Sequence, residues 1–170
     1  MTTSAGPLHA VAVSVAIDAD GPLAGALILG PSSVGKSSLA LLLIGSCPYG
    51  RTSLIADDAV VIEVNAGRLW ARAPEALRGL IEIRGYGPTP VRSVLSGNLL
   101  MAVNLGLPPE RTPTPRIFHP LPAGPALPLF PFIWKGGEWT ATTRLRWMIA
   151  SILGGQIQQR THDSGYILRG

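Results

Sequence analysis

Charged residues, cysteine and long apolar runs are all scarce in this chain of 170 residues. Only 14% of the residues are charged, while the chain has 20 Gly and 16 Pro. This composition excludes a coiled coil and a charge-rich disordered chain. A single cysteine, Cys47, excludes an internal disulfide framework and is typical of a reducing compartment. The length fits one domain over residues 1–170 with a substantial core.

The absence of long apolar runs and of basic clusters argues against a membrane and a nucleic acid as partners. The longest apolar run, residues 39–44, is far shorter than the ~20 residues that a membrane-spanning helix needs. The first residues, MTTSAGPLHA, lack the basic start and apolar core of a signal peptide. The formal charge of +4 comes from scattered cations, mostly arginine. We therefore expect a cytoplasmic protein with no membrane and no nucleic-acid partner.

Hydrophobic patterning predicts two helices and several strands. A helix should follow residue 35 and end near Gly45, and a C-terminal helix should cover 142–153, where apolar residues fall on one face. The segment 108–131 holds nine of the 16 prolines, so we expect it to be mostly loop. Apolar, β-branched or alternating segments predict strands at 9–17, 24–29, 53–64, 68–72, 79–85 and 99–105.

A phosphate-binding loop is the strongest motif. Gly30-x4-Gly35-Lys36-Ser37 matches the Walker A pattern, with an apolar strand before it and a helix after it. Backbone N–H groups of such a loop face the phosphates, while the lysine supplies a cation and the serine a hydroxyl for Mg²⁺. Lys36 is one of two lysines in a chain that otherwise uses arginine. The predicted nucleotide-binding residues are Gly30, Pro31, Ser32, Ser33, Val34, Gly35, Lys36, Ser37 and Ser38.

Two acidic sites interrupt predicted strands. Asp57 and Asp58 lie within an apolar segment, and neighbours on a strand point to opposite faces, so we expect different functions unless a bulge directs both to one site. A general base or a metal ligand is the functional interpretation, and a solvated strand end is the alternative. Glu82 and Arg84 share a strand face, either beside a site or as an exposed ion pair.

These motifs together resemble the HPr kinase/phosphorylase family. The resemblance rests on GPSSVGKSSLALLLI, LIADDAVVIEV and ARAPEALRGLIEIRGYG, of which Ile81–Gly87 is the most specific part. It covers roughly residues 9–135 and looks like a short form that lacks the N-terminal regulatory domain. It implies an α/β P-loop domain of the phosphoenolpyruvate-carboxykinase-like type with a mixed, strand-rich core. It also implies ATP- and Mg²⁺-dependent phosphorylation of a serine on the phosphocarrier HPr, the reverse phosphorolysis, and a homo-oligomer, by analogy a hexamer.

The resemblance also implies residue roles. Lys36 would hold the phosphates, and Ser37 and Glu82 would ligate Mg²⁺. Asp58 matches the base that takes the serine proton, and His9 matches the catalytic histidine, with a surface histidine as the alternative. Asp57 and Arg84 would support the site.

The chain departs from the family pattern in several places, among them the separation of 21 residues between His9 and Gly30, which is longer than expected, and the C-terminal helix. Ser33 stands where the family prefers glycine, and no residue clearly matches the arginine that contacts phosphoserine. Arg116, Arg144 and Arg146 are candidates for that arginine. Two other functions stay open: a P-loop kinase for another substrate, and a nucleotide-binding regulatory module without transfer activity.

Overall fold

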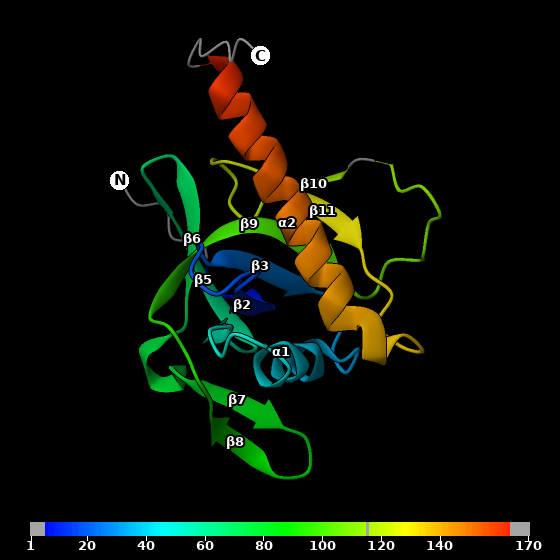
Figure 1. Cartoon of the computed structure of the whole chain (residues 1–170). Helices are drawn as coiled ribbons and strands as arrows, with labels where there is room; N and C mark the ends of the chain where they lie inside the picture. Colours follow the sequence, from blue (N-terminus) through cyan, green and yellow to red (C-terminus); the bar gives the residue numbers. More distant parts are fainter. Residues whose placement is uncertain (1–5, 115, 164–170) are drawn as a thin grey trace.

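A mixed sheet with two helices on one face forms the body of the protein (Figure 1). The structure is a computed structural model that describes residues 6–114 and 116–163. In chain order its elements are β1 Leu8–His9, β2 Val11–Val15, β3 Ala24–Leu29, α1 Lys36–Gly45, β4 Ser53–Ala56, β5 Ala59–Asn65, β6 Arg68–Arg72, the 3-10 turn η1 Glu75–Leu77, β7 Leu80–Ile83, β8 Gly87–Pro90, β9 Ser96–Asn104, β10 Arg116–Phe118, β11 Leu127–Pro131 and α2 Glu138–Asp163.

The main sheet has the strand order β1-β5-β6-β9-β3-β2-β4. β9 runs parallel to β3 and to β11, and the other pairings are antiparallel, so the sheet is mixed. β7 and β8 pair with each other as a separate two-stranded sheet. This arrangement confirms the predicted α/β class with a strand-rich core.

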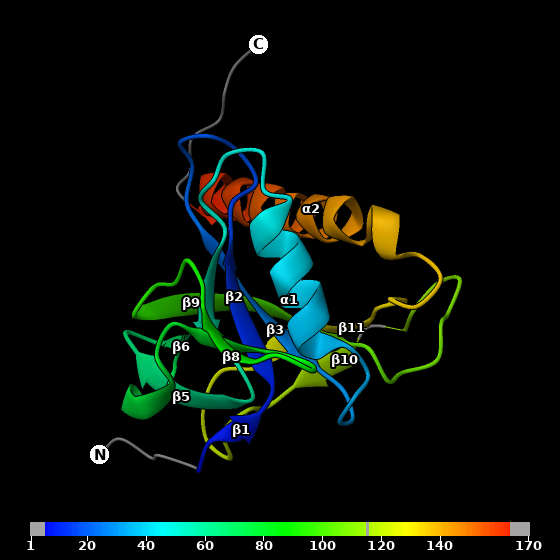
Figure 2. The same cartoon turned by 90° about the horizontal axis from the view of Figure 1, so that it is seen from below.

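The two faces of the sheet carry different parts of the core. Alternate residues of β2, such as Val11 and Val13, pack with α1 and α2 in one cluster. Leu39 and Leu43 of α1 and Leu145 of α2 are fully buried in it. The opposite face of the sheet packs against the curled strands β5 and β6 in a second cluster. Figure 2 shows α1 and α2 lying on the same side of the strands β2, β3 and β9.

Several elements differ from the sequence predictions. The C-terminal helix is longer than 142–153. The described part of the proline-rich segment 108–131 is mostly loop, as predicted, but it also contains the strands β10 and β11. β8 was not predicted, because its prolines lack an N–H group; a two-stranded edge position tolerates them.

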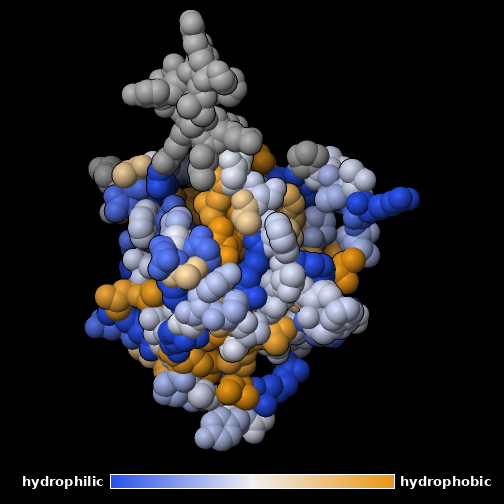
Figure 3. All heavy atoms as spheres, viewed as in Figure 1, coloured by the Kyte–Doolittle hydropathy of each residue, from blue (hydrophilic) through white to orange (hydrophobic). Residues whose placement is uncertain are grey.

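Viewed as in Figure 1, apolar residues lie at several places on the surface between hydrophilic ones (Figure 3). Among the described residues, neither helix combines the length and apolar character needed to cross a membrane.

Candidate functional site

The register of three strands brings distant sequence segments to one end of the sheet. β2 is antiparallel to β3, with Val11 opposite Ile28, and antiparallel to β4, with Ala12 opposite Ala56. The start of β2 therefore lies beside the ends of β3 and β4. The phosphate loop leaves the end of β3, and Asp57 directly follows β4. The pairing of β1 with β5 places His9 opposite Ala59, next to the same point.

The phosphate loop ends in a left-handed glycine at the start of α1. Gly35 has φ 106°, and a Cβ there would lie 2.2 Å from Nε1 of Trp134, so both the backbone and the packing require glycine. Lys36, the first residue of α1, is 7% exposed, and its Nζ donates to the carbonyl oxygens of Gly30 (2.9 Å) and Pro31 (3.0 Å). Lys36 thus turns its side chain back along the loop that should bind phosphate.

Burial and two aspartates have opposite effects on the pKa of Lys36. Burial lowers the pKa of Lys36 below its usual value, and the carboxylates of Asp58 and Asp57 offset part of this effect. Lys36 thus lies close enough to both aspartates for their carboxylates to act on its ammonium group.

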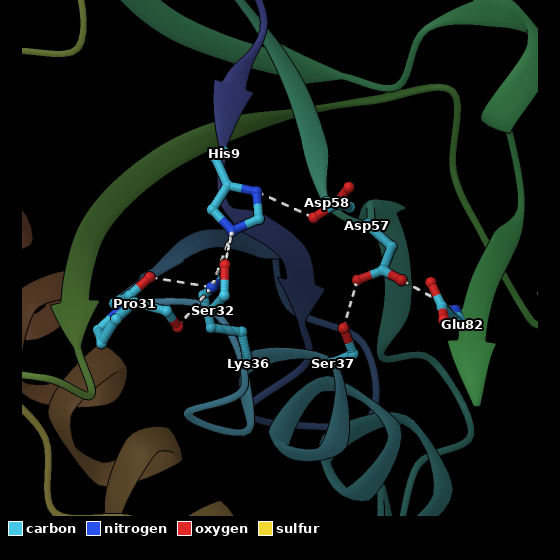
Figure 4. Close-up of polar contacts among 9 residues, drawn as sticks. His9, Pro31, Ser32, Lys36, Ser37, Asp57, Asp58 and Glu82 are labelled. Atoms are coloured by element: carbon cyan, nitrogen blue, oxygen red, sulfur yellow. Dashed lines mark hydrogen bonds and ion pairs between the residues drawn. The ribbon is translucent and has the colours of Figure 1, made fainter. Parts of the chain in front are cut away.

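Asp57 is a buried carboxylate with a partner for each oxygen. It is 6% exposed; Oδ1 accepts a hydrogen bond from Ser37 Oγ at 2.7 Å, and Oδ2 accepts one from the backbone N–H of Glu82 at 2.9 Å. These contacts join α1, the end of β4 and β7 (Figure 4). Because a buried charge needs such partners, the two bonds explain how Asp57 can interrupt an apolar segment.

Asp58, unlike Asp57, pairs with His9. The backbone N–H of Ala59 donates to the carbonyl oxygen of Asp57 (2.8 Å), which closes a three-residue turn with Asp58 at φ 65°. His9 Nδ1 lies 2.9 Å from Asp58 Oδ1, and its Nε2 lies 3.4 Å from Lys36 Nζ. Since the lysine can only donate, these contacts fit a neutral imidazole that carries its proton on Nδ1. Figure 4 shows the imidazole ring between the aspartate and the phosphate loop.

The two aspartates have different contacts yet border the same cavity. The turn breaks the strand between β4 and β5, so the alternation of strand faces does not separate Asp57 from Asp58. The cavity measures about 460 Å³. Its lining consists of His9, Val11, Ser32, Ser33, Gly35, Lys36, Ser37, Ser38, Leu41, Asp57, Asp58, Glu82, Ile83 and Arg84.

Most of the predicted site residues meet at this cavity. Gly30, Pro31 and Val34 belong to the loop but not to the lining. Three apolar lining residues were not predicted, because single apolar residues in a helix or strand carry no distinct signal in a sequence: Val11, Leu41 and Ile83.

The three candidate arginines for a phosphoserine contact lie elsewhere. Arg116 forms an ion pair with Glu110, and Arg144 donates to the carbonyl oxygen of Ile133 at 2.7 Å. Neither these two nor Arg146 lines the described cavity. Sequence reasoning therefore left this role unassigned, and the geometry of the described residues assigns it to none of the three.

The oxygen donors around Ser37 fit a magnesium ion. Mg²⁺ prefers hard oxygen ligands and is usually held by one or two carboxylates together with phosphate oxygens and water. The hydroxyl of Ser37 and the carboxylate of Asp57 touch each other, and the exposed Glu82 borders the same cavity. The sequence predicts Glu82 as the carboxylate that ligates Mg²⁺ together with Ser37. In the structure the carboxylate in contact with Ser37 is that of Asp57, and Glu82 contacts Asp57 through its backbone N–H.

Curated proteins with similar sequences are HPr kinase/phosphorylases. The HPr kinase/phosphorylase of Thermoanaerobacter sp. (strain X514) is 39% identical over 85 residues, which are 49% of this chain and 27% of that protein. The HPr kinase/phosphorylase of Caldicellulosiruptor bescii is 48% identical over 71 residues, 41% of this chain and 22% of that protein. The aligned part of the chain thus spans about a quarter of the length of these curated relatives.

The fold and the family model extend this similarity. The structure of the HPr(Ser) kinase/phosphatase from Coxiella burnetii matches with a TM-score of 0.65 at 22% identity, over 94% of this chain and 96% of that chain, which shows a shared fold. The family model of the HPr serine kinase C-terminal domain matches residues 6–100, more than half of the chain and all of the segment that builds the cavity. The chain therefore belongs to the HPr serine kinase C-terminal domain family.

Proposed function

We propose that this protein transfers the γ-phosphoryl group of ATP to a serine hydroxyl of an HPr-type phosphocarrier protein. One observation supports this most: a phosphate loop with Lys36 and a hydrogen-bonded Asp58–His9 pair border the same cavity. A loop for phosphates alone would fit any nucleotide-binding module. A carboxylate beside it, placed to accept a proton, is what transfer to a hydroxyl requires.

Each group has a defined part in the proposed reaction. The serine oxygen bonds to the γ-phosphorus, the bond from that phosphorus to the bridging oxygen of ADP breaks, and the serine proton goes to a carboxylate oxygen of Asp58. Asp58 suits this role because its side chain is 72% exposed and an acceptor can reach it. His9 holds one oxygen of Asp58 by its Nδ1–H, which leaves the other oxygen for the proton.

Lys36 and the oxygen donors of Ser37 and Asp57 serve the nucleotide. The ammonium group, which donates to loop carbonyl oxygens, can donate to phosphate oxygens instead, since both are hydrogen-bond acceptors. Ser37 and Asp57, with Glu82 nearby, would hold Mg²⁺. When bound, the ion would neutralise charge on the phosphates.

The acceptor, the reverse reaction and the assembly are further parts of the proposal. The relatives are HPr kinase/phosphorylases, and the chain aligns with only part of their length. Phosphorolysis of phosphoserine-HPr would use the same Asp58 as an acid. A homo-oligomer, by analogy a hexamer, and a cytoplasmic location stay predictions.

Incubation of the purified protein with γ-labelled ATP, Mg²⁺ and HPr tests the proposal. We expect label on an HPr serine, identified by mass spectrometry, and none when that serine is replaced by alanine. Label on another added protein or small molecule, but not on HPr, would indicate a P-loop kinase for a different substrate. Nucleotide binding without any transfer would indicate a regulatory module and would contradict the proposal.

A further inference from the structure

Ser33 has an unusual backbone conformation for a serine in the middle of the phosphate loop. Its φ is 66°, in the left-handed region, which side chains other than those of glycine, asparagine and aspartate rarely adopt. Glycine would occupy this conformation without strain. The side chain of Ser33 is exposed, so packing in the core does not account for it. The contact made by its hydroxyl is therefore the feature that distinguishes serine from glycine at this position.

The hydroxyl of Ser33 binds an arginine 51 residues away in the sequence. Arg84 Nη2 donates to Ser33 Oγ at 2.9 Å. Arg84 follows directly after β7, and the β7–β8 hairpin pairs only with itself in the described sheets. Ile81 of this hairpin is buried. Two hydrogen bonds connect the hairpin to the site: Arg84 donates to Ser33 of the phosphate loop, and the N–H of Glu82 donates to Asp57 after β4.

Arg84 supplies half of the formal positive charge around the cavity. The lining carries three carboxylates, from Asp57, Asp58 and Glu82, but only two cations, Lys36 and Arg84. A nucleoside triphosphate brings further negative charge into this space. Arginine has five N–H donors in a fixed plane, and the bond to the serine uses one of them. None of the others is bonded to a described residue, so they can bind a phosphate oxygen.

We propose that Ser33 is a positioning residue, whose hydroxyl holds the guanidinium of Arg84 over the phosphate loop so that Arg84 binds a phosphoryl oxygen of the nucleotide. An exposed arginine otherwise samples many rotamers, and ordering it on binding costs entropy. The bond to Ser33 removes much of that cost before the nucleotide arrives. This inference rests on the proposed phosphoryl transfer, because it assigns a second cation to the same nucleotide.

The test is a double-mutant cycle on nucleotide affinity. Calorimetry would measure the binding of a non-hydrolysable ATP analogue with Mg²⁺ to the wild type, Ser33→Ala, Arg84→Ala and the double variant. We expect each single variant to weaken binding by about 10- to 100-fold, in line with one lost hydrogen bond to a charged group. The double variant should bind no more weakly than Arg84→Ala, since the serine acts through the arginine. Additive losses would overturn the inference.

Thermal unfolding separates positioning from a merely structural role. Ser33→Gly also lacks the hydroxyl but relieves the left-handed backbone, so its unfolding midpoint should lie above that of Ser33→Ala. Both variants should nevertheless lose the same affinity. If Ser33→Gly binds the analogue as tightly as the wild type, the hydroxyl does not position Arg84.

Two controls complete the test. Arg78 is exposed, precedes the same hairpin and makes no side-chain hydrogen bond to another described residue, so Arg78→Ala removes an equal charge and should not change affinity. Lys36→Ala should weaken binding whether or not Ser33 matters. Unchanged binding by Lys36→Ala would contradict the proposed function itself, whereas weaker binding by Lys36→Ala with unchanged Ser33 and Arg84 variants would contradict this inference alone.

Discussion

Replacement of Asp57 by alanine should destabilise the fold much more than a change at the adjacent Asp58. The buried carboxylate of Asp57 accepts hydrogen bonds from Ser37 Oγ (2.7 Å) and from the N–H of Glu82 (2.9 Å). Each hydrogen bond to a charged group contributes about 1.5–3 kcal/mol, so the loss of both should lower the free energy of unfolding by about 3 kcal/mol or more. For a domain of this size, that corresponds to a fall of about 6–12 °C in the unfolding midpoint.

Two asparagine variants should lower the free energy of unfolding by smaller amounts than Asp57→Ala. In Asp57→Asn, the amide oxygen can still accept from Glu82 and the amide nitrogen can donate to Ser37, so we expect a loss of only about 1 kcal/mol. Asp58→Asn is the matched control, because the Asp58 side chain is 72% exposed and asparagine tolerates the φ of 65°. It should change the free energy of unfolding by less than about 0.5 kcal/mol.

Thermal unfolding followed by circular dichroism, with urea titration as a second measure, gives these values. The expected order of midpoints is wild type and Asp58→Asn together, then Asp57→Asn, then Asp57→Ala. Equal midpoints for Asp57→Ala and Asp58→Asn would refute the assignment of Asp57 as the residue that joins α1, β4 and β7.

Three further variants or measurements test other groups. Lys36→Ala should abolish transfer and weaken ATP binding, measured by single-turnover assay and calorimetry; normal transfer by the folded variant would contradict the phosphate-loop assignment. Glu82→Ala should raise the Mg²⁺ concentration needed for half-maximal transfer, and identical titrations would remove Glu82 from the metal site. Burial raises the pKa of Cys47, but hydrogen bonds from Thr52 and from backbone N–H groups of the adjacent turn lower it to about 6. Alkylation of folded protein by iodoacetamide should therefore show a midpoint near pH 6, against about 8.5 in urea, and Thr52→Val should raise the midpoint in folded protein.

The phosphate loop and its flanking elements could be predicted because their signals are local. The strand at 24–29 and the end of the helix at Gly45 match the structure, since apolar content and a glycine at the boundary determine both over a few residues. The proline-rich segment is mostly loop, as predicted, but the position of β11 within it was not predicted; β11 forms there because β9 offers a free edge for parallel pairing. Such pairing partners depend on the whole sheet and leave no local pattern.

The site geometry was less predictable because it depends on contacts between distant segments. Strand alternation predicted opposite faces for Asp57 and Asp58, and their contacts do differ, but a positive-φ turn brings both to one cavity. The shared strand face predicted for Glu82 and Arg84 left two interpretations open, an exposed ion pair or a position beside a site. β7 ends at Ile83, so Arg84 lies in a turn and contacts the phosphate loop instead.

Single-turnover transfer by Asp58→Asn tests the central claim, that this chain moves a phosphoryl group to a hydroxyl with Asp58 as the base. Enzyme in excess over γ-labelled ATP, with Mg²⁺ and HPr, would be compared for the wild type and the variant, beside equilibrium binding of the nucleotide. A positioned base contributes about 10²–10⁴-fold, so the rate should fall by that factor while nucleotide affinity stays within about twofold. Transfer at the wild-type rate by Asp58→Asn would contradict the account, even with the fold and the phosphate loop intact.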